Sequence, residues 1–371
     1  MKLLHIITSL DKLYGAQRHV LECVKTQLQQ GFECYVITGK KGTTSQMVEQ
    51  LGVTVFEIPL INNSYNIFSN YRAVFAVQSK ITELSPNLVI AHSSKAGLLS
   101  RLACFHVRVP NLFTVHGWSF EKGTPFIQRL FGKLSEKWLV KYSDWYHCVS
   151  QQTADYGFKH LQLPPQKVLI APNLHSMAAI TLMPPKRHNK VIMVAEMRKQ
   201  KNHLLVIDAW KLLVEKKSFV PELLFIGDGK ERKQIEKAIE KKGLTNYITI
   251  IGETNQVSAY YQNCDVVVLV SRYEGLPLTL IEALQHGKPV VASKVGGNET
   301  IVKDGKNGFL LAENNATSLA NYIEELYQNP QLMAAMGEEG LAHYKNYFAR
   351  EQLAEQMLQI IQTAAQQSRY Q

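Results

Sequence analysis

Residues 271–287 read SRYEGLPLTLIEALQHG and follow a short apolar run at Val266–Val270. Within them, the Glu-Gly pair at 274–275 predicts a turn. The proline at 277 suits the first position of a helix, and the glycine at 287 suits the residue that ends it. The segment therefore predicts a buried strand that turns directly into a helix, which is the repeating unit of a parallel α/β sheet.

The same alternation of short apolar runs and helical stretches extends over both halves of the chain. Strands are expected at 3–8, 34–38, 88–91, 111–115 and 145–149 in the first half, and at 191–194, 222–226, 248–251, 266–270 and 289–292 in the second. Between the halves, residues 163–190 hold five prolines and no long periodicity, which is the composition of a linker. Buried runs of this kind predict parallel sheets covered on both faces.

The expected fold class is α/β, with two doubly wound, Rossmann-like domains at 1–175 and 176–350 that face a central cleft. A last helix over 351–371 is expected to pack back towards the N-terminal domain. Ligands of such sheets bind beyond the carboxyl ends of the strands, so the cleft between the domains is the expected site.

Composition excludes several classes of protein. The chain has 371 residues, of which 46% are hydrophobic and 19% charged, so it can bury two cores and is not disordered. No apolar run approaches the roughly 18 residues of a spanning helix. The opening residues MKLLHIITSLD are too polar for a secretory leader and predict a first strand instead. The net charge of +10 favours an acidic partner such as a phosphate, a nucleotide or anionic lipid.

The spacing of cysteines and carboxylates bears on location and on metals. The five cysteines are an odd number, lie far apart and include no C-x-x-C, so neither a disulfide framework nor a zinc site is expected. A cytoplasmic location fits best, because thiols stay reduced there. No Asp-x-Asp occurs, which argues against a cation held by carboxylates. We therefore expect no metal ligands and no cofactor.

Residues 126–142, FIQRLFGKLSEKWLVKY, form an amphipathic pattern. Apolar side chains at 127, 130, 131, 134 and 138 share one helical face, and basic ones at 129, 133, 137 and 141 recur every fourth residue. A basic amphipathic helix can lie on anionic lipid. We favour the ordinary alternative, a surface helix whose apolar face packs into the core, because such helices are normal in globular proteins.

The start of the helix in residues 271–287 is suited to binding an anion. The amides from Leu276 to Thr279 would lack acceptors within the helix, and a helix N-terminus attracts phosphate. Glu274 would stand at the turn and face the ligand, and Glu282 would lie about two turns along the same helix. Two glutamates at this spacing are common by chance, so only the glycine turn at a helix start makes the pair informative.

Four segments together carry a resemblance to a known family. YEGLPLTLIEALQHGKPVVAS (273–293) resembles the E-x7-E segment of the family-4 retaining glycosyltransferases, which have the two-domain GT-B fold. The other segments agree with the family in order and spacing. The family's strand–Gly-Asp-Gly–helix unit resembles LLFIGDGKERKQIE (223–236), and its following loop resembles VGGNETIVKDGKNGFLL (295–311). The N-domain histidine segment of capsule, O-antigen and lipopolysaccharide hexosyltransferases resembles LFTVHGWSF (112–120). The resemblance covers nearly the whole chain. It implies an acceptor side in the N-terminal domain and a nucleotide-sugar donor side in the C-terminal domain.

The resemblance implies roles for the helix start and its two glutamates. Glu274 would contact hydroxyls of the donor sugar near the reacting centre. Glu282 would accept hydrogen bonds from the two ribose hydroxyls of the nucleotide, which suits a two-oxygen acceptor. The diphosphate would lie on the backbone of Gly275, Leu276, Pro277, Leu278 and Thr279.

A second segment, VIMVAEMRKQKNH (191–203), would supply positive charge for the leaving diphosphate. By resemblance Arg198 and Lys201 carry that charge. Glu196 departs from the arginine that the family usually has at its position. Gly252 and Glu253, after the strand at 248–251, would frame the nucleotide base through backbone atoms.

Three segments of the first domain are candidates for the same site. In LDKLYGAQRH (10–19), Gly15 would let the backbone approach the donor phosphate or the acceptor, whereas Tyr14 replaces the family's first glycine. His116 ends a predicted strand and by resemblance contacts the donor sugar near the anomeric carbon, so His116 and Glu274 are the expected catalytic residues. For residues 92–95, HSSK, the sequence supports a contact with phosphate or acceptor and a purely structural role equally.

As a whole, the resemblance implies a retaining glycosyltransferase. It would move a hexose of the glucose, galactose, N-acetylhexosamine or mannose type from a nucleotide diphosphate sugar, expected to be UDP-linked, to a hydroxyl of a bacterial cell-surface glycan or its lipid-linked precursor. The enzyme would need no metal and would lie in the cytoplasm, with peripheral contact to anionic lipid at the inner face of the membrane. No nucleic-acid motif accompanies the positive charge, so nucleic acid is not an expected partner.

Two other classes remain open. A sugar-nucleotide 2-epimerase on a related two-domain fold would need further acid–base carboxylates and no acceptor. A non-catalytic scaffold that binds nucleotide sugar is open because Glu196 and Tyr14 depart from the family pattern. A dinucleotide dehydrogenase is disfavoured, because Arg232 stands where a third glycine would follow Gly227 and Gly229.

Overall fold

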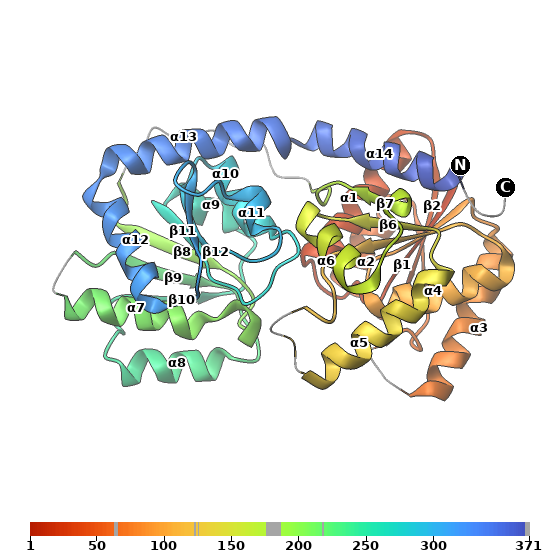
Figure 1. Ribbon diagram of the computed structural model, residues 1–371, viewed down its shortest axis with the longest axis horizontal. Helices are drawn as coiled ribbons and strands as arrows, with labels where there is room; N and C mark the ends of the chain where they lie inside the picture. Colours follow the sequence, from red (N-terminus) through yellow and green to blue (C-terminus); the bar gives the residue numbers. More distant parts are fainter. Residues whose placement is uncertain (63–65, 122–123, 125, 176–186, 217–218, 368–371) are drawn as a thin grey trace. The chain divides into compact units, whose positions relative to one another are not determined.

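The computed structural model describes residues 1–62, 66–121, 124, 126–175, 187–216 and 219–367. The chain divides into two compact units, Met1–Ser176 with Arg350–Gln371, and Met177–Ala349. Pro184 and Pro185 of the expected linker lie outside the described residues. In each unit, Figure 1 shows a central sheet flanked by helices.

The first unit is built on one seven-stranded parallel sheet. Its strands are β1 (Lys2–Ile7), β2 (Glu33–Thr38), β3 (Thr54–Glu57), β4 (Leu88–Ala91), β5 (Asn111–Val115), β6 (Trp145–Cys148) and β7 (Val168–Ile170). Their order across the sheet is β3-β2-β1-β4-β5-β6-β7, so the winding direction reverses between β1 and β4. At such a reversal the loops after the two strands lie beside each other, which is the usual ligand position in these sheets.

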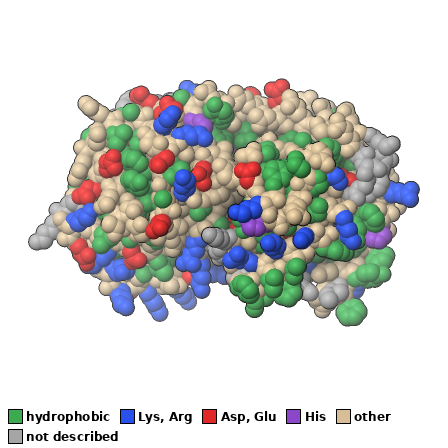
Figure 2. Space-filling view, viewed as in Figure 1, with side chains coloured by type: hydrophobic (Ala, Val, Ile, Leu, Met, Phe, Trp, Pro, Cys, Tyr) green, Lys and Arg blue, Asp and Glu red, His purple; other side chains and the backbone are tan. Residues whose placement is uncertain are grey.

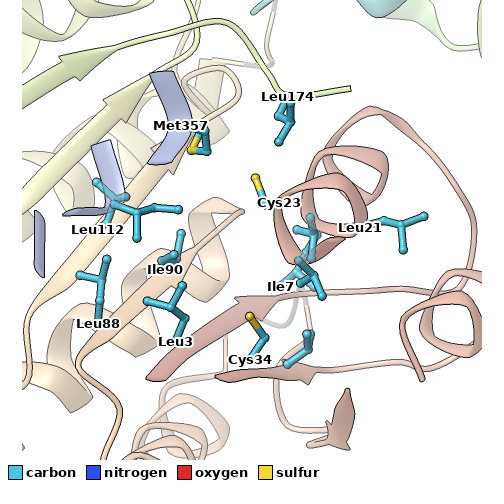
Figure 3. Packing of buried hydrophobic residues seen from close by; sticks show 14 of the residues in the cluster. Leu3, Ile7, Leu21, Cys23, Cys34, Leu88, Ile90, Leu112, Leu174 and Met357 are labelled. Carbon is cyan, nitrogen blue, oxygen red and sulfur yellow. The ribbon is translucent and has the colours of Figure 1, made fainter. Parts of the chain in front are cut away.

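Helices cover both faces of this sheet because its central strands are buried on both sides. They are α1 (Gly15–Gln29), α2 (Thr43–Glu49), α3 (Ile67–Leu84), α4 (Ser94–Val107), α5 (Phe126–Leu139), α6 (Gln151–Leu161) and α14 (Arg350–Gln366). Leu3 of β1 packs into a cluster with Met357 of α14, whereas Leu4 packs into the opposite cluster under α3 and α4. Figure 3 shows Met357 together with Leu3 and Ile90 in the first of these clusters. The last helix therefore belongs to the core of the first unit.

The second unit repeats this plan with a six-stranded parallel sheet. Its strands are β8 (Lys190–Val194), β9 (Glu222–Ile226), β10 (Ile248–Gly252), β11 (Val266–Leu269), β12 (Val290–Ser293) and β13 (Gly308–Leu311), in the order β10-β9-β8-β11-β12-β13. Its helices are α7 (His203–Glu215), α8 (Arg232–Lys241), α9 (Val257–Gln262), α10 (Leu278–Gln285), α11 (Asn298–Ile301), α12 (Ala316–Gln328) and α13 (Pro330–Tyr347). In the described part of the chain, no helix combines the length and the apolar character needed to cross a membrane.

The two doubly wound α/β domains expected from the sequence are confirmed, but some elements differ. Sequence reasoning missed β3, β7 and β13. The linker interpretation is wrong for β7, a short edge strand that pairs with β6 and is too brief to show a period. Pro277 does not occupy the first helical position, because α10 begins one residue later, at Leu278.

The favoured interpretation of residues 126–142 is also wrong. In α5 the apolar side chains expected in the core are exposed, and Ile127 keeps 69% of its surface in contact with solvent. The side that packs inward carries Glu136 and Leu139 instead. Glu136 pairs with the fully buried Arg101 of α4 at 3.0 Å, so a buried ion pair, and not the apolar stripe, sets the rotation of the helix.

Candidate active site

The loops that follow β8 and β11 lie together because the strand order of the second sheet reverses between these two neighbours. Hydrogen bonds join the two loops. The amide of Arg272 donates to the carbonyl of Gln200 at 2.8 Å, and Gln200 Nε2 donates to the carbonyl of Tyr273 at 2.8 Å. Two segments with strong sequence signals, 191–203 and 271–287, therefore form one surface at the carboxyl edge of this sheet.

Lys201 and Glu274 form an ion pair on this surface. Lys201 Nζ lies 2.5 Å from Glu274 Oε1, and Ser271 Oγ donates to the same oxygen at 2.6 Å. The Glu274 side chain is 7% exposed and that of Lys201 19%. A charge-assisted bond and a hydroxyl bond on one oxygen hold the carboxylate in one orientation. Sequence reasoning singled out both charged residues but missed Ser271, although it opens the same motif.

Arg198 has a different partner. Its Nε lies 2.8 Å from Glu196 Oε1, and its side chain is 58% exposed. The glutamate that departs from the family pattern thus neutralises the arginine beside it. The structure brings Lys201 to Glu274 and pairs Arg198 within its own loop, so the two cations predicted together have different carboxylate partners.

The first turn of α10 opens onto the same surface. Thr279 Oγ1 donates to the carbonyl of Val194 at 3.0 Å, which ties the start of this helix to the end of β8. The amides of Leu278 and Thr279 belong to a first helical turn, whose N–H groups have no acceptor within the helix. Pro277 has no N–H, so it shapes the expected phosphate site without donating to it.

Glu282 lies farther along α10 and has a buried partner. The hydroxyl of Tyr261, from α9, lies 2.9 Å from Glu282 Oε2 and 3.1 Å from the carbonyl of Thr279. Burial and the neighbouring Glu282 carboxylate raise the pKa of Tyr261 well above its ordinary value, so the phenol stays protonated and can donate. Nothing in the local sequence pattern pointed to Tyr261, because its contact with Glu282 joins two different helices, α9 and α10.

The glycines at 296 and 297 press the loop before α11 against the backbone of this site. A Cβ on Gly296 would lie 1.7 Å from the carbonyl oxygen of Glu274, and one on Gly297 would lie 2.0 Å from that of Gly275. Only glycine permits so close a backbone approach. These glycines contribute to the family resemblance, but their close approach to the backbone of Glu274 and Gly275 was not predicted from the sequence.

We expect Gly296→Ala to lower the free energy of unfolding by about 2–5 kcal/mol, the combined cost of left-handed backbone and overpacking. Its φ is +49° and its Cβ would strike a carbonyl. Gly305→Ala is the matched control, because φ there is +72° with open space around the new methyl group. Urea unfolding of both variants checks the prediction, and equal losses would contradict it.

Gly252 is the last residue of the outer strand β10, and Glu253 follows it. Gly252 has a φ of +86°, and its carbonyl accepts a hydrogen bond from the amide of Gly227 at 2.8 Å. A Cβ on Gly227 would in turn lie 2.3 Å from the carbonyl of Ala195, after β8. Backbone contacts therefore connect the expected base-framing loop, strand by strand, to the loop that carries Lys201.

The remaining predicted residues lie in the first unit. Gly15 is the first residue of α1, and no heavy atom lies within 4 Å of the Cβ position it leaves open. His116 directly follows β5, and both of its ring nitrogens are shielded from solvent. A hydrogen bond with the neighbouring Asn173 side chain opposes the lowering of its pKa by burial.

His116 belongs to a cluster of histidines that was not predicted from the sequence, and its ring contacts those of His19 and His92. The rings of His5, His19, His92, His116 and His147 lie with neighbouring centroids 5.1–5.9 Å apart. Hydrogen bonds assign the tautomers of two of them. His5 Nε2 donates to Gln27 Oε1 at 2.8 Å, which leaves His5 Nδ1 to accept from His92 Nε2 at 2.9 Å. His92 Nδ1 then presents a lone pair that no described residue occupies.

Burial keeps this cluster neutral. It lowers the pKa of His116 to about 3 and that of His5 and His147 to about 4. Burial, reinforced by the neighbouring rings, holds the pKa of His19 and His92 well below the ordinary range. Within the described residues, no three His, Cys, Asp or Glu side chains are grouped so that they could hold a metal ion.

We expect acid to destabilise the protein between about pH 6.5 and pH 4. The histidines of the unfolded chain bind protons below their ordinary pKa of about 6.5, whereas those of the folded cluster bind protons only near their lowered pKa values. The free energy of unfolding therefore falls as the pH falls, by up to about 1.4 kcal/mol per pH unit for each histidine. Urea unfolding across this range checks the slope. His147→Gln should reduce it, and replacement of the exposed His106 by asparagine should not; a flat profile would contradict the prediction.

Comparison with known proteins places this chain in a class of enzyme. A family model described as Glycosyltransferase Family 4 matches residues 14–174, and one described as Glycosyl transferases group 1 matches residues 181–343. The chain belongs to the glycosyltransferases that these two models describe, and the resemblance stated from the sequence is confirmed.

Particular relatives match along most of their length. The chain is 27% identical over 331 residues to UDP-Gal:alpha-D-GlcNAc-diphosphoundecaprenol alpha-1,3-galactosyltransferase of Escherichia coli, covering 84% of each chain. It is 24% identical over 333 residues to the O-antigen biosynthesis glycosyltransferase WbnH of Escherichia coli, covering 89% of this chain and 91% of WbnH. Among solved structures, Anabaena HepE in complex with UDP and glucose matches with a TM-score of 0.83 at 21% identity, over 98% of this chain and all of HepE. The GT-B fold expected from the resemblance is confirmed.

Proposed function

We propose that this glycosyltransferase is a retaining hexosyltransferase that uses a UDP-linked sugar and needs no metal ion. The observation that carries the proposal is the Lys201–Glu274 pair beside the first turn of α10, where the second sheet reverses. A cation and helix amides suit a diphosphate, and a fixed carboxylate next to them suits the hydroxyls of the sugar attached to it.

During transfer, negative charge develops on the departing nucleoside diphosphate. The amides of Leu278 and Thr279 and the ammonium of Lys201 would hold that charge. Glu274 would accept hydrogen bonds from sugar hydroxyls, while His116 would meet the sugar near the anomeric carbon. The acceptor hydroxyl would attack from the face on which the phosphate leaves and pass its proton to a departing phosphate oxygen, so the anomeric configuration is kept.

The donor and the acceptor are proposed by analogy with the substrates named for the relatives. One solved structure of HepE is a complex with UDP-glucose, and the Escherichia coli galactosyltransferase is named for UDP-galactose and a diphosphoundecaprenol acceptor. By analogy, this protein would transfer to a bacterial cell-surface glycan or its lipid-linked precursor at the cytoplasmic face of the membrane. The second unit would bind the donor and the first unit the acceptor.

Calorimetric titration of UDP, GDP and ADP in EDTA tests the nucleotide and the metal independence together. Binding of UDP in preference to the other two supports the proposal, and no binding by any of them contradicts it. Purified protein is then given UDP-hexoses with lipid-linked acceptor, and the anomeric configuration of the product is read by NMR. An inverted product would contradict retention, and a 2-epimer formed without acceptor would identify an isomerase.

Glu282→Ala is expected to weaken the binding of UDP and of uridine alike, by about 1–3 kcal/mol, because both ligands carry the ribose hydroxyls. Tyr261 keeps the carbonyl of Thr279 as an acceptor at 3.1 Å, so the fold should be spared. Calorimetry with both ligands gives the two affinities, and the melting temperature is the control. An unchanged affinity for uridine would remove Glu282 from the ribose site.

A further inference from the structure

The exposed face of α5 carries a group of large apolar side chains. Six large apolar side chains project from it into solvent: Phe126, Ile127, Leu130, Phe131, Leu134 and Trp138. Phe131 is 63% exposed, which is far more than a helix packed on its apolar stripe would leave. Figure 2 shows hydrophobic and basic side chains next to each other over the region where Figure 1 places α5. Apolar surface of this extent on one helix marks an interaction site.

Positive charge borders this apolar face on one side. Lys133, Lys137 and Lys141 are exposed and follow each other at helical spacing. The acidic residue of α5, Glu136, points inward, and its charge is paired with that of Arg101. The face that meets solvent is therefore apolar and cationic, with no carboxylate of its own helix to offset the lysines.

Aromatic residues carry the same surface onto α4. The ring of Trp138 lies 4.8 Å from that of Tyr142, which in turn lies 5.0 Å from the ring of Phe105 in α4. Lys141 Nζ stands 4.8 Å from the centre of the Tyr142 ring. Aromatic rings and lysine stems of this kind match the boundary between lipid headgroups and acyl chains.

We propose that this α5 face, residues 126–141, docks the first unit on a lipid bilayer that carries anionic headgroups. Apolar side chains enter the headgroup–acyl boundary, and the row of lysines pairs with lipid phosphates and carboxylates. A second copy of the chain is a poor occupant, because a symmetric contact would bring the lysine rows of two copies against each other. The proposal concerns the first unit alone and does not rest on the proposed transfer reaction.

Trp138 makes the docking directly observable. The chain has four tryptophans; Trp118, Trp145 and Trp210 are buried, while Trp138 is 48% exposed. Vesicles of phosphatidylcholine mixed with phosphatidylglycerol should shift the tryptophan emission to the blue, and brominated lipid should quench it. The affinity for vesicles of phosphatidylcholine alone should be lower by about tenfold or more, and high salt should reduce binding to the anionic vesicles.

Two variants and their controls test the surface. Phe131→Gln with Leu134→Gln should lower partitioning into anionic vesicles by about tenfold or more, whereas Ser135→Gln, exposed on the same helix, should not change it appreciably. Lys133→Gln with Lys137→Gln should lower it at low salt, and Lys345→Gln in the second unit should not. All these side chains are exposed, so folding and UDP titration should stay as in the parent protein.

The outcomes separate this proposal from its rivals and from the proposed reaction. An absence of binding to anionic vesicles, or equal binding by the Phe131 and Ser135 variants, overturns the docking surface. Self-association that the Phe131 variant abolishes, with no vesicle binding, would assign the face to a second copy and overturn it as well. Vesicle binding by a protein that fails to bind UDP would support the surface and contradict only the proposed function.

Discussion

Replacing Glu274 by glutamine is expected to lower kcat by on the order of 10²–10³-fold, the usual loss when one preorganised polar contact to the reacting group is removed. Glutamine keeps the shape of the side chain and can still accept from Ser271, which lies 2.6 Å from Glu274 Oε1. It loses the charge that would orient the sugar hydroxyls. Transfer from a UDP-hexose, followed by release of UDP, measures the effect.

The same variant should bind free UDP as well as the parent protein or more tightly. In the structure Glu274 holds Lys201 at 2.5 Å, so removing the carboxylate charge frees the ammonium for phosphate. Calorimetry gives this affinity, and the melting temperature shows whether the fold is intact. Normal turnover would exclude Glu274 from the reaction, whereas lost UDP binding in a folded protein would place it in the nucleotide site instead.

Lys201→Met is expected to weaken the binding of UDP by about 1.5–3 kcal/mol, roughly 10- to 150-fold in Kd, because a charge-assisted contact to the diphosphate is lost. Uridine, which has no phosphate, should bind with unchanged affinity. Titration of both ligands therefore separates a phosphate contact from general damage to the site. Equal weakening of uridine would contradict the assignment.

A double variant addresses the one complication of Lys201→Met. Glu274 is 7% exposed, so removing its ion-pair partner leaves a poorly solvated carboxylate and destabilises the fold. Lys201→Met combined with Glu274→Gln relieves that penalty and should recover melting temperature without recovering UDP affinity. The non-additive part of the two stability changes measures the ion pair itself.

Arg198 provides a comparison within the same loop. Its guanidinium is exposed and already paired with Glu196, so the structure gives it no contact with Glu274. By resemblance, Arg198 and Lys201 were both predicted to supply positive charge for the diphosphate. What separates them is which carboxylate each one reaches, and that depends on the neighbouring loop after β11.

Strands with strongly apolar, sharply bounded runs could be predicted to the residue. β4, β5 and β9 have the limits expected from the sequence. β7 could not be predicted, since it exists only because β6 offers an edge for pairing. The rotation of α5 could not be predicted either, because helical periodicity identifies an apolar stripe but not which side the rest of the chain will cover.

The sequence by itself determined the alternation of strands and helices, the turn before α10 and the family, because these depend on neighbours in the chain and on motif spacing. Only the tertiary structure decided that Lys201 meets Glu274, which lies 73 residues farther along, that Tyr261 meets Glu282, and that Gly296 presses on the Glu274 carbonyl. The physical reason is the reversal of strand order between β8 and β11, which brings the loops after these strands side by side and so selects the partner of each charge.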